Sequence, residues 1–329
     1  MKLAFFEVEP WQKQYLKKRL KGQDIKFFEN ELTPKNVTKI KDVEILAVFI
    51  YSEINKEILD KLPKLKFIIT RSTGFDHVDI KECKSRRIKA SNVPYYGENT
   101  VAEHALGLMI ALSKKLPRAV NQARKGDFDI EGLEGRDIKG KTLGVIGCGH
   151  IGQHLLKIAK AMEMKRLVST RTHKPSLAKK LGFRYVSLNE LLKKSDIISL
   201  HCPLTEKTRH LINMKNIKHI KKGAFLVNTA RGGLIQTNAL IYALDKEILA
   251  GAALDVLEEE EDLKQERHLS TRKLSKQERK ILKQNHQLLK DRDVLITPHT
   301  AFYTREAMQR ILDTTIENIR SSGRKNRIV

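Results

Sequence analysis

The sequence of 329 residues contains few cysteines and no long apolar run. Its three cysteines, Cys83, Cys148 and Cys202, lie far apart and form no CxxC pair, so a disulfide framework is not expected. No apolar stretch approaches the roughly 20 residues that a membrane helix requires. Acidic residues at positions 7 and 9 come too early for the apolar stretch of a signal peptide. We therefore expect a soluble, reduced, cytoplasmic protein without membrane contact.

Two familiar site motifs are also missing. No cluster of Cys, His and acidic residues has the spacing of metal ligands. The Gly-x-x-x-x-Gly-Lys-Ser/Thr phosphate loop is absent as well. The sequence therefore predicts neither a metal site nor an NTPase.

Positive charge, by contrast, is abundant. The 63 Lys and Arg residues exceed the 39 Asp and Glu residues, which gives a formal net charge of +24. A nucleic-acid-binding protein usually concentrates such charge on one face or arm. Here the basic residues are spread along the chain in short clusters, such as residues 17–19. We expect a solvated basic surface, which would also attract anionic substrates and coenzymes, rather than a nucleic-acid site.

Short apolar runs alternate with amphipathic stretches along the chain, which is typical of parallel sheets covered by helices. A first series fills the first 90 residues, a helical pattern follows at about 99–116, and a second series begins at Lys141 after an irregular connection, 126–140. We predict an α/β protein with two doubly wound parallel-sheet domains. The predicted strands are residues 2–6, 25–28, 45–51, 66–70, 88–90, 142–146, 166–170, 197–200, 224–228, 250–254 and 294–296.

Gly147, Gly149 and Gly152 form a G-x-G-x-x-G pattern directly after one of these predicted strands. The pattern alone is a weak signal, but a helical stretch follows it. This strand–turn–helix context lets bare backbone approach a pyrophosphate at a helix N-terminus. The sequence therefore predicts a dinucleotide-binding loop, which also contains His150 and Ile151.

The end of the next predicted strand bears on the choice of coenzyme. An NAD-binding unit usually has Asp or Glu there, roughly 20 residues after the loop, to bind the ribose hydroxyls. In this sequence Thr170 and Arg171 occupy that place. A hydroxyl and a guanidinium suit a 2′-phosphate better, so we expect a preference for NADP. The alternative is that Arg171 stacks on adenine or points to solvent.

An Arg, an acidic run and a His follow three later predicted strands. They are Arg231, the run that begins three residues after Asp255, and His299. The carboxyl ends of parallel strands meet at one edge of a sheet, where ligands bind. Arg can bind a carboxylate through two parallel hydrogen bonds, His can carry a proton, and a neighbouring carboxylate can orient the ring. These groups fit hydride transfer to a 2-oxo acid, although each could singly be an ordinary structural residue.

Seven stretches form a set of motifs along the chain: residues 72–79, 92–104, 147–152, 201–205, 227–233, 253–260 and 297–301. Together they resemble the D-isomer-specific 2-hydroxyacid dehydrogenase family, and within it the D-lactate dehydrogenase-like branch. The resemblance covers essentially the whole chain in the family's order. It implies a Rossmann cofactor domain (100–298) inserted in a flavodoxin-like substrate domain (1–99 and 299–329), with the active site in the cleft.

The resemblance also implies catalytic roles. Arg231 would bind the carboxylate and carbonyl of the substrate, and His299 would be the acid and base. Glu260, five residues after Asp255, would be the carboxylate paired with His299; only the family spacing distinguishes Glu260 from its acidic neighbours. The highly charged stretch 260–299 is longer than in many family members, and its apolar residues, among them Leu263, Leu269, Ile281 and Leu288, indicate amphipathic helices without a chemical role.

Binding residues follow from the same resemblance. The backbone around Thr73 and Gly74 would bind the substrate carboxylate, and Tyr96 would border the substrate pocket. Asp255 would hold the nicotinamide carboxamide. The residues implied for the coenzyme site are Gly147, Gly149, His150, Ile151, Gly152, Thr170, Arg171, Cys202, Pro203, Thr208, Thr229, Ala230 and Asp255.

We therefore expect an NAD(P)-dependent oxidoreductase that reversibly reduces a small 2-oxo acid, such as pyruvate, to the D-2-hydroxy acid. The family implies a homodimer. A glyoxylate or hydroxypyruvate reductase is the alternative among enzymes. A nucleotide-sensing binding protein on the same fold is the alternative of another class, and retention of Arg231, Glu260 and His299 argues against it. His77, His104 and His201 are expected to serve structure.

Overall fold

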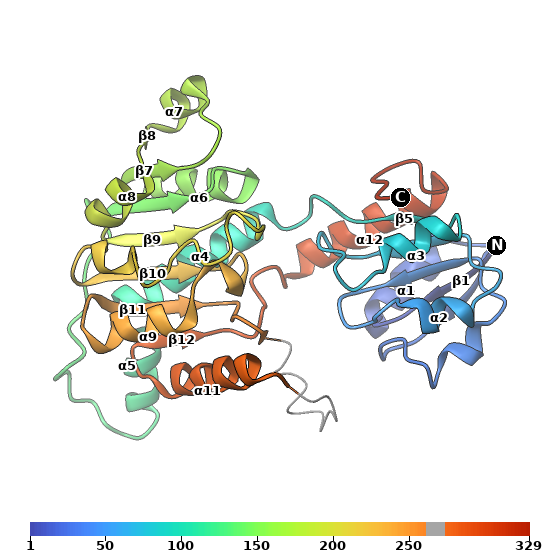
Figure 1. Cartoon of the computed structure of the whole chain (residues 1–329), viewed down its shortest axis with the longest axis horizontal. Helices are drawn as coiled ribbons and strands as arrows, with labels where there is room; N and C mark the ends of the chain where they lie inside the picture. Colours follow the sequence, from blue (N-terminus) through green and yellow to red (C-terminus); the bar gives the residue numbers. More distant parts are fainter. Residues whose placement is uncertain (261–273) are drawn as a thin grey trace. The chain divides into compact units, whose positions relative to one another are not determined.

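The computed structural model describes residues 1–260 and 274–329 and divides the chain into two compact units (Figure 1). Unit 1 consists of Met1–Tyr96 and Tyr303–Val329, and unit 2 of Gly97–Phe302. The expected boundaries, after residues 99 and 298, lie within a few residues of these. Each unit has one parallel sheet with helices on both faces, so the predicted α/β class is confirmed.

The sheet of unit 1 has the order β2-β1-β3-β4-β5, which is the flavodoxin-like order. In β1, Leu3 and Phe5 pack toward α1 and α12, whereas Ala4 packs toward α2 and α3 on the other face. The chain returns to this unit at its end through α12. The strands are β1 (Lys2–Phe5), β2 (Asp24–Phe27), β3 (Ile45–Val48), β4 (Phe67–Thr70) and β5 (Lys89–Ser91), and the helices are α1 (Pro10–Arg19), η1 (Val37–Ile40), α2 (Lys56–Asp60), α3 (Ile80–Ser85) and α12 (Arg305–Arg320).

The sheet of unit 2 has the order β12-β11-β10-β9-β6-β7-β8, the Rossmann order extended by one strand. The order reverses direction between β6 and β9, which makes this the switch point where ligands bind in such sheets. The strands are β6 (Thr142–Ile146), β7 (Lys165–Ser169), β8 (Arg184–Tyr185), β9 (Ile197–Leu200), β10 (Ala224–Asn228), β11 (Leu249–Leu254) and β12 (Val294–Ile296).

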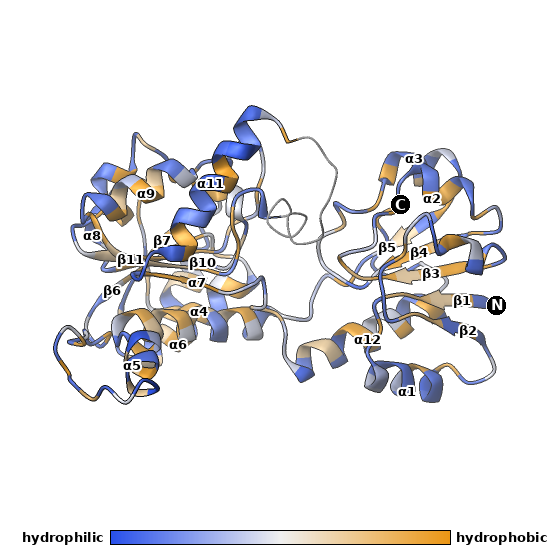
Figure 2. Ribbon diagram, turned by 90° about the horizontal axis from the view of Figure 1, so that it is seen from below, coloured by the Kyte–Doolittle hydropathy of each residue, from blue (hydrophilic) through white to orange (hydrophobic). Residues whose placement is uncertain are grey.

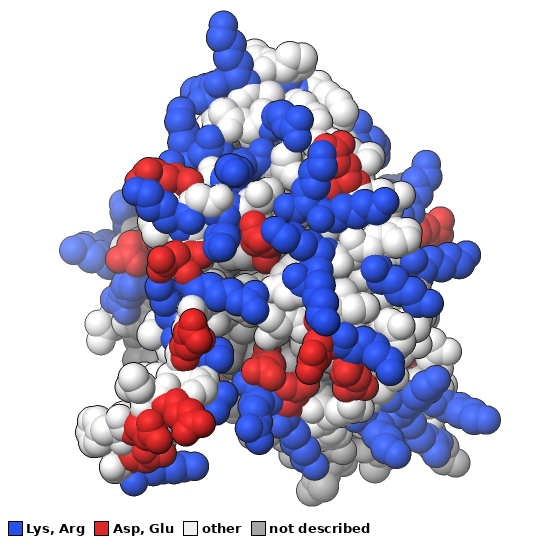
Figure 3. Space-filling view, turned by 90° about the vertical axis from the view of Figure 1, so that its left-hand side faces the viewer, with Lys and Arg blue, Asp and Glu red and all other residues white. Residues whose placement is uncertain are grey.

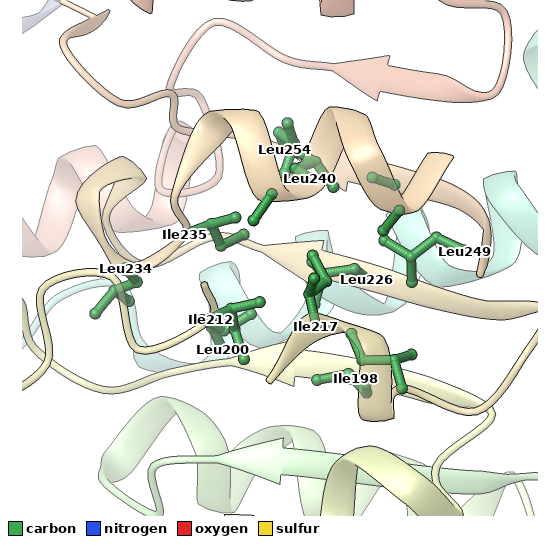
Figure 4. Packing of buried hydrophobic residues seen from close by; sticks show 14 of the residues in the cluster. Ile198, Leu200, Ile212, Ile217, Leu226, Leu234, Ile235, Leu240, Leu249 and Leu254 are labelled. Atoms are coloured by element: carbon green, nitrogen blue, oxygen red, sulfur yellow. The ribbon is translucent and has the colours of Figure 1, made fainter. Parts of the chain in front are cut away.

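Helices cover both faces of this sheet: Figure 2 shows α8, α9 and α11 on one face and α4 and α6 on the other. On the first face, Ile198, Leu200, Leu226 and Leu254 pack with Leu240 of α9 (Figure 4). The helices are α4 (Glu98–Ser113), α5 (Leu116–Ala123), α6 (His150–Ala161), α7 (Pro175–Leu181), α8 (Leu188–Lys194), η2 (Ile217–His219), η3 (Gly232–Leu234), α9 (Thr237–Asp245) and α11 (Lys276–Lys290).

Several predicted elements differ from the structure for local reasons. The strand predicted to reach Tyr51 ends at Val48, because the backbone N–H groups of Phe49 and Tyr51 donate to the Glu7 carboxylate instead of a ladder. The helix predicted to reach residue 116 ends earlier, because Lys115 has a φ of 50° and a new helix begins beyond it.

In the charged stretch, α11 is an amphipathic helix with Ile281 and Leu288 buried. The predicted contributions of Leu263 and Leu269 lie outside the described residues. Within the part of the chain that the structure describes, no helix is long and apolar enough to span a membrane. The same residues contain no cluster of three or more His, Cys, Asp and Glu that could hold a metal ion.

Candidate active site

The predicted coenzyme and catalytic residues of unit 2 lie at the carboxyl ends of its strands. The glycine loop follows β6, Arg231 follows β10, the acidic run follows β11 and His299 follows β12. Parallel strands place these segments at one edge of the sheet, as the sequence analysis anticipated.

The glycine loop is shaped to hold a phosphate group. Gly147 has a φ of 96°, and a Cβ there would lie 2.7 Å from the backbone nitrogen of Cys202. A Cβ at Gly152 would lie 2.4 Å from the Gly147 carbonyl oxygen, whereas at Gly149 no described atom lies within 4 Å. The backbone is thus tightly packed on one side and open at the N-terminus of α6, where no side chain caps the helix. These residues fit a dinucleotide pyrophosphate.

The end of β7 carries cations and hydroxyls instead of a carboxylate. Thr170 is half-buried and Arg171 is exposed. Beyond them, His173 stacks on Tyr185, with ring centroids 4.3 Å apart. The Tyr185 hydroxyl accepts a hydrogen bond from the backbone nitrogen of Lys174 at 2.9 Å. An ordered, positively charged turn therefore replaces the acidic residue typical of NAD-binding units.

The segment after β9 supplies the opposite wall of the switch point. The Thr208 hydroxyl donates to the Pro203 carbonyl at 2.7 Å, so it shapes the loop. Burial raises the pKa of the Cys202 thiol to about 11, and it also raises the pKa of Cys148 in the glycine loop. Both thiols are therefore protonated at neutral pH, in agreement with a packing role rather than a redox role.

His201, at the start of the same segment, is a neutral structural histidine. Its Nε2 lies 2.8 Å from the Ser199 hydroxyl, and its buried Nδ1 has no hydrogen-bond partner among the described residues. Burial lowers the pKa of His201 to about 4. Among the described residues, no carboxylate forms a hydrogen bond with this ring.

The turn after β10 positions Arg231. The buried Asn228 side chain donates to the Arg231 carbonyl at 2.9 Å and accepts from the Ala230 nitrogen at 3.0 Å, which fixes the turn. Arg231 itself is exposed and donates to the Ala230 carbonyl at 2.7 Å. The buried hydroxyl oxygen of Thr229 has no partner among the described residues, and a bound coenzyme could supply one.

Asp255 anchors the segment that contains the candidate acid–base group. Only 1% of Asp255 is exposed, and its Oδ1 accepts from the Thr297 hydroxyl at 2.5 Å and the Thr300 nitrogen at 2.8 Å. Its Oδ2 accepts from the Ala301 nitrogen at 2.9 Å. His104 of α4 adds a contact to Thr297 at 3.2 Å. This network holds the backbone on both sides of His299, whose φ is 56°.

Glu260 and His299 form a hydrogen-bonded pair. The Glu260 Oε1 lies 2.6 Å from the His299 Nδ1, and the Glu260 Oε2 accepts from the Leu257 nitrogen at 3.3 Å. The His299 Nε2 has no hydrogen-bond partner among the described residues, and the side chain is 30% exposed. The carboxylate therefore fixes the ring and leaves the second nitrogen available for proton transfer.

The acidic run contains a second pair that the sequence analysis missed. Glu258 lies 2.5 Å from the Nε2 of His210, and only 6% of Glu258 is exposed. No local pattern marks His210, which is 48 residues away in sequence. The structure thus separates the neighbouring glutamates: Glu258 is buried against His210, Glu259 is exposed and Glu260 contacts His299. The fourth, Glu261, lies outside the described residues.

Unit 1 contains the remaining residues predicted to bind substrate. Thr73 and Gly74 follow β4, and Tyr96 ends the unit's first segment. The Thr73 hydroxyl donates to the Val93 carbonyl at 3.0 Å, and the Ser72 hydroxyl donates to the Gly74 carbonyl at 2.7 Å. The loop is therefore internally ordered, and its role in substrate binding stays a prediction.

The surface of unit 2 has no single-sign patch on the face seen in Figure 3. Lys and Arg side chains are spread over this face, and Asp and Glu side chains lie between them. Elsewhere in the described part of unit 2, basic side chains pair with acidic ones, such as Lys221 with Asp196 at 2.6 Å and Lys194 with Glu190 at 2.8 Å. This distribution is typical of a solvated surface.

Comparisons with known proteins identify relatives over nearly the whole chain. The family model described as "D-isomer specific 2-hydroxyacid dehydrogenase, NAD binding domain" matches residues 106–301. A D-lactate dehydrogenase of Escherichia coli (strain K12) is 36% identical over 330 residues, which cover 97% of this chain and 96% of that protein. A glyoxylate reductase of Thermococcus litoralis is 40% identical over 250 residues, which cover 71% of this chain and 76% of that protein. Among solved structures, D-lactate dehydrogenase from Aquifex aeolicus, complexed with NAD and lactic acid, is 33% identical, has a TM-score of 0.84 and is covered over 99% of both chains.

Proposed function

Because the chain belongs to the D-isomer specific 2-hydroxyacid dehydrogenase family, as an NAD(P)-dependent oxidoreductase of its D-lactate dehydrogenase-like branch, we propose that it reduces pyruvate to D-lactate. The observation that carries the proposal is the Glu260–His299 pair, at 2.6 Å, on the sheet edge that also presents Arg231. A relative named D-lactate dehydrogenase that covers nearly the full chain supports the choice of pyruvate.

Each catalytic residue has a distinct task in this reaction. Arg231 binds the substrate carboxylate through paired hydrogen bonds and polarises the adjacent carbonyl. Glu260 holds the Nδ1 of His299, so the Nε2 donates the proton to the carbonyl oxygen as it becomes a hydroxyl. The nicotinamide coenzyme, when bound, supplies the hydride. In the reverse direction, the His299 Nε2 accepts the hydroxyl proton.

The binding residues complete the proposal. Backbone groups around Thr73 and Gly74 bind the substrate carboxylate, and Tyr96 limits the size of the substrate. In the coenzyme site, the glycine loop and the N-terminus of α6 bind the pyrophosphate, because the space beside Gly149 is open and no side chain caps the helix. Thr229 and Cys202 border the nicotinamide side. Asp255 acts first as the anchor of the His299 segment, since three donors from that segment already occupy its oxygens.

Glyoxylate is the second candidate substrate. The similarity to a glyoxylate reductase, at 40% identity over 71% of this chain, favours it. Arg231, Glu260 and His299 serve either acid equally well, because both substrates have a carbonyl beside a carboxylate. The size of the pocket beside that carbonyl then decides between them.

Loss of nicotinamide absorbance tests this function directly. The purified protein is assayed with pyruvate, glyoxylate, hydroxypyruvate and a bulkier 2-oxo acid, each with NADH and with NADPH. We expect the highest kcat/KM with pyruvate. A higher kcat/KM with glyoxylate would replace pyruvate by the second candidate, and no turnover with any acid would contradict the proposal.

The same assay tests a preference for NADPH. Arg171 and the cationic turn after β7, without a carboxylate, suit a 2′-phosphate. Solved relatives are complexed with NAD, so the preference is a proposal about this chain alone. We expect Arg171→Ser to reduce kcat/KM with NADPH by roughly tenfold while activity with NADH changes little. Equal losses with both coenzymes would contradict a phosphate contact.

We also propose that the protein is a homodimer that pairs through an arm of unit 2, residues 116–136. This arm exposes Leu116, Val120, Phe128 and Ile130, the last two at 81% each. It borders a hollow of about 1040 Å³. Exposed apolar groups gathered on one projecting segment mark an interface.

Light scattering tests this assembly. We expect a dimer for the natural chain and a monomer for a Phe128→Asp, Ile130→Asp double variant, because charged groups cannot be buried at such an interface. Met162→Asp, at an exposed apolar position outside the arm, is the matched control. A double variant that stays dimeric would contradict the role of the arm.

A further inference from the structure

Glu258 is a buried carboxylate whose contacts neither substrate binding nor the coenzyme explains. It is 6% exposed and lies two residues before Glu260. Its Oε1 lies 2.5 Å from the His210 Nε2. Its Oε2 accepts from both the backbone nitrogen, at 3.1 Å, and the hydroxyl, at 2.7 Å, of Thr237. Both carboxylate oxygens therefore have partners on two different segments.

The partner segments are fixed parts of unit 2. Thr237 is the first residue of α9, so the carboxylate lies at the N-terminus of that helix, where the helix dipole favours negative charge. His210 belongs to the loop between β9 and η2, and its φ is 51°. The His210 nitrogen donates to the Gly233 carbonyl at 2.8 Å, which joins this loop to the turn that follows Arg231.

A third element holds the main chain of the same residue. The Asn285 side chain, on α11, donates to the Glu258 carbonyl at 2.8 Å, and Asn285 is completely buried. The charged stretch that the sequence analysis left without a chemical role thus contributes a specific contact. Glu258 is held at its carboxylate by the β9–η2 loop and α9, and at its carbonyl by α11.

The position of Glu258 determines the position of Glu260. Glu259 between them has a φ of 52°, a left-handed conformation that forms a tight turn. On the other side, a Cβ at Gly232 would lie 2.0 Å from the Leu257 carbonyl, so this turn packs directly on the residue after Arg231. A displacement of Glu258 would therefore move Glu260 relative to both His299 and Arg231.

We propose that Glu258 is a positioning residue for proton transfer. Together with His210, Thr237 and Asn285 it forms a clasp that fixes Glu260 against His299. This inference rests on the catalytic roles proposed above for Glu260 and His299. Burial of the Glu258 carboxylate costs desolvation energy, and its hydrogen bonds to His210 and Thr237 offset that cost. A buried charge held in this way can fix the position of the backbone that carries it.

A double-mutant cycle of Glu258→Gln and Glu260→Gln tests the clasp. Gln at position 258 keeps the shape of the side chain but loses the charge that His210 and Thr237 contact. In the otherwise natural enzyme we expect Glu258→Gln to lower kcat roughly tenfold. KM and the dissociation constant of the reduced coenzyme, measured by its fluorescence, should change by less than about twofold. In the Glu260→Gln background the same change should lower kcat by less than about twofold.

Two further variants keep the cycle interpretable. Glu259→Gln, the exposed neighbour, is the matched control and should retain full activity. Thr237→Val removes one hydrogen bond to Glu258 and leaves the backbone bond, so it tests the coupling if Glu258→Gln fails to fold. We expect it to lower kcat roughly threefold, and only in the presence of Glu260.

The outcomes separate this inference from the proposed function. Equal losses from Glu258→Gln with and without Glu260, when Glu260→Gln alone is strongly impaired, would overturn the clasp and leave the catalytic roles intact. A Glu260→Gln enzyme as active as the natural one would overturn the role of Glu260 and the clasp together. A loss confined to KM would also overturn the clasp.

Discussion

Two His–Glu pairs in unit 2 draw their carboxylates from the same acidic run, yet they have different surroundings. In both pairs the histidine has a positive φ, 51° for His210 and 56° for His299. The Glu258 side chain is 5% exposed and the Glu260 side chain 21% exposed. The Glu258 carboxylate accepts from Thr237 of α9 and contacts His210, whereas the Glu260 carboxylate contacts His299 and accepts from the Leu257 nitrogen of its own turn.

The comparison shows that a His–carboxylate pair is not by itself a sign of catalysis. His299 is distinguished by its second ring nitrogen. Its Nδ1 contacts Glu260, whereas its Nε2 has no hydrogen-bond partner among the described residues. Its segment is anchored through Asp255 rather than through its own ring. The more buried pair provides rigidity, and the more exposed pair retains a group for proton transfer.

The largest effect should follow from a change at the exposed pair. His299→Gln removes the proton donor, so we expect kcat to fall by a factor on the order of 10² to 10⁴. The dissociation constant of the coenzyme should be nearly unchanged, because the ring is not part of the glycine loop. Steady-state assays and coenzyme fluorescence measure both quantities. If the His299→Gln enzyme has the kcat of the natural enzyme, His299 is not the proton donor and the proposed distinction between the two pairs is wrong.

A change at the buried pair should lower the stability of unit 2 more than a change at the exposed pair. His210→Gln removes the imidazole that contacts the buried Glu258 carboxylate, and we expect the free energy of unfolding to fall by about 3 kcal/mol. His299→Gln, at the more exposed pair, should cost less than about 1 kcal/mol. Hydrogen exchange of peptides from α9 and β10 reports unit 2 separately. Similar losses in the two variants would contradict the comparison.

His201, which contacts no carboxylate among the described residues, extends the comparison of the two pairs. The expected effect on stability is smaller. Burial lowers the pKa of His201 to about 4, below the roughly 6.5 of an unfolded chain, so the unfolded state binds more protons between these values. Stability conferred by the neutral ring is therefore complete above pH 6.5 and is lost as the pH falls toward 4.

We expect His201→Asn to remove about 2 kcal/mol of the stability that the natural chain loses between pH 7.5 and pH 5. Denaturation at a series of pH values compares the two slopes below pH 6.5. An unchanged acid slope in the variant would show that the pKa of His201 is the same in the folded and unfolded chain, which contradicts the effect of burial.

Much of the fold could be predicted because buried parallel strands are short apolar runs. The strands at 142–146, 197–200, 224–228 and 294–296 have the predicted bounds. The short strand β8, Arg184–Tyr185, lacks such a run and was missed. Strand β3 ends before its apolar run does, because the Glu7 carboxylate, 42 residues from Phe49, binds the backbone there.

The sequence could predict which residues of the candidate site lie at the same sheet edge, but not which side chains contact each other. Strand ends place Arg231, the acidic run and His299 at one edge, and this follows from topology alone. Which glutamate contacts which histidine depends on the turn at Glu259 and on the partner of Glu258, far away in sequence. Local patterns contain no information on such contacts, so only the family spacing indicated Glu260.

The discontinuity of unit 1 has a consequence for synthesis on the ribosome. Leu312, Ile316 and Ile319 of α12 cover the sheet face formed by Leu3 and Phe5 of β1. Helix α1 can cover part of this face early, but α12 is the last helix of the chain. The nascent chain must therefore emerge almost completely before the face is fully buried, whereas unit 2 is contiguous in the chain. Between these two moments part of the apolar face stays exposed, and such surface is prone to aggregation until α12 packs on it.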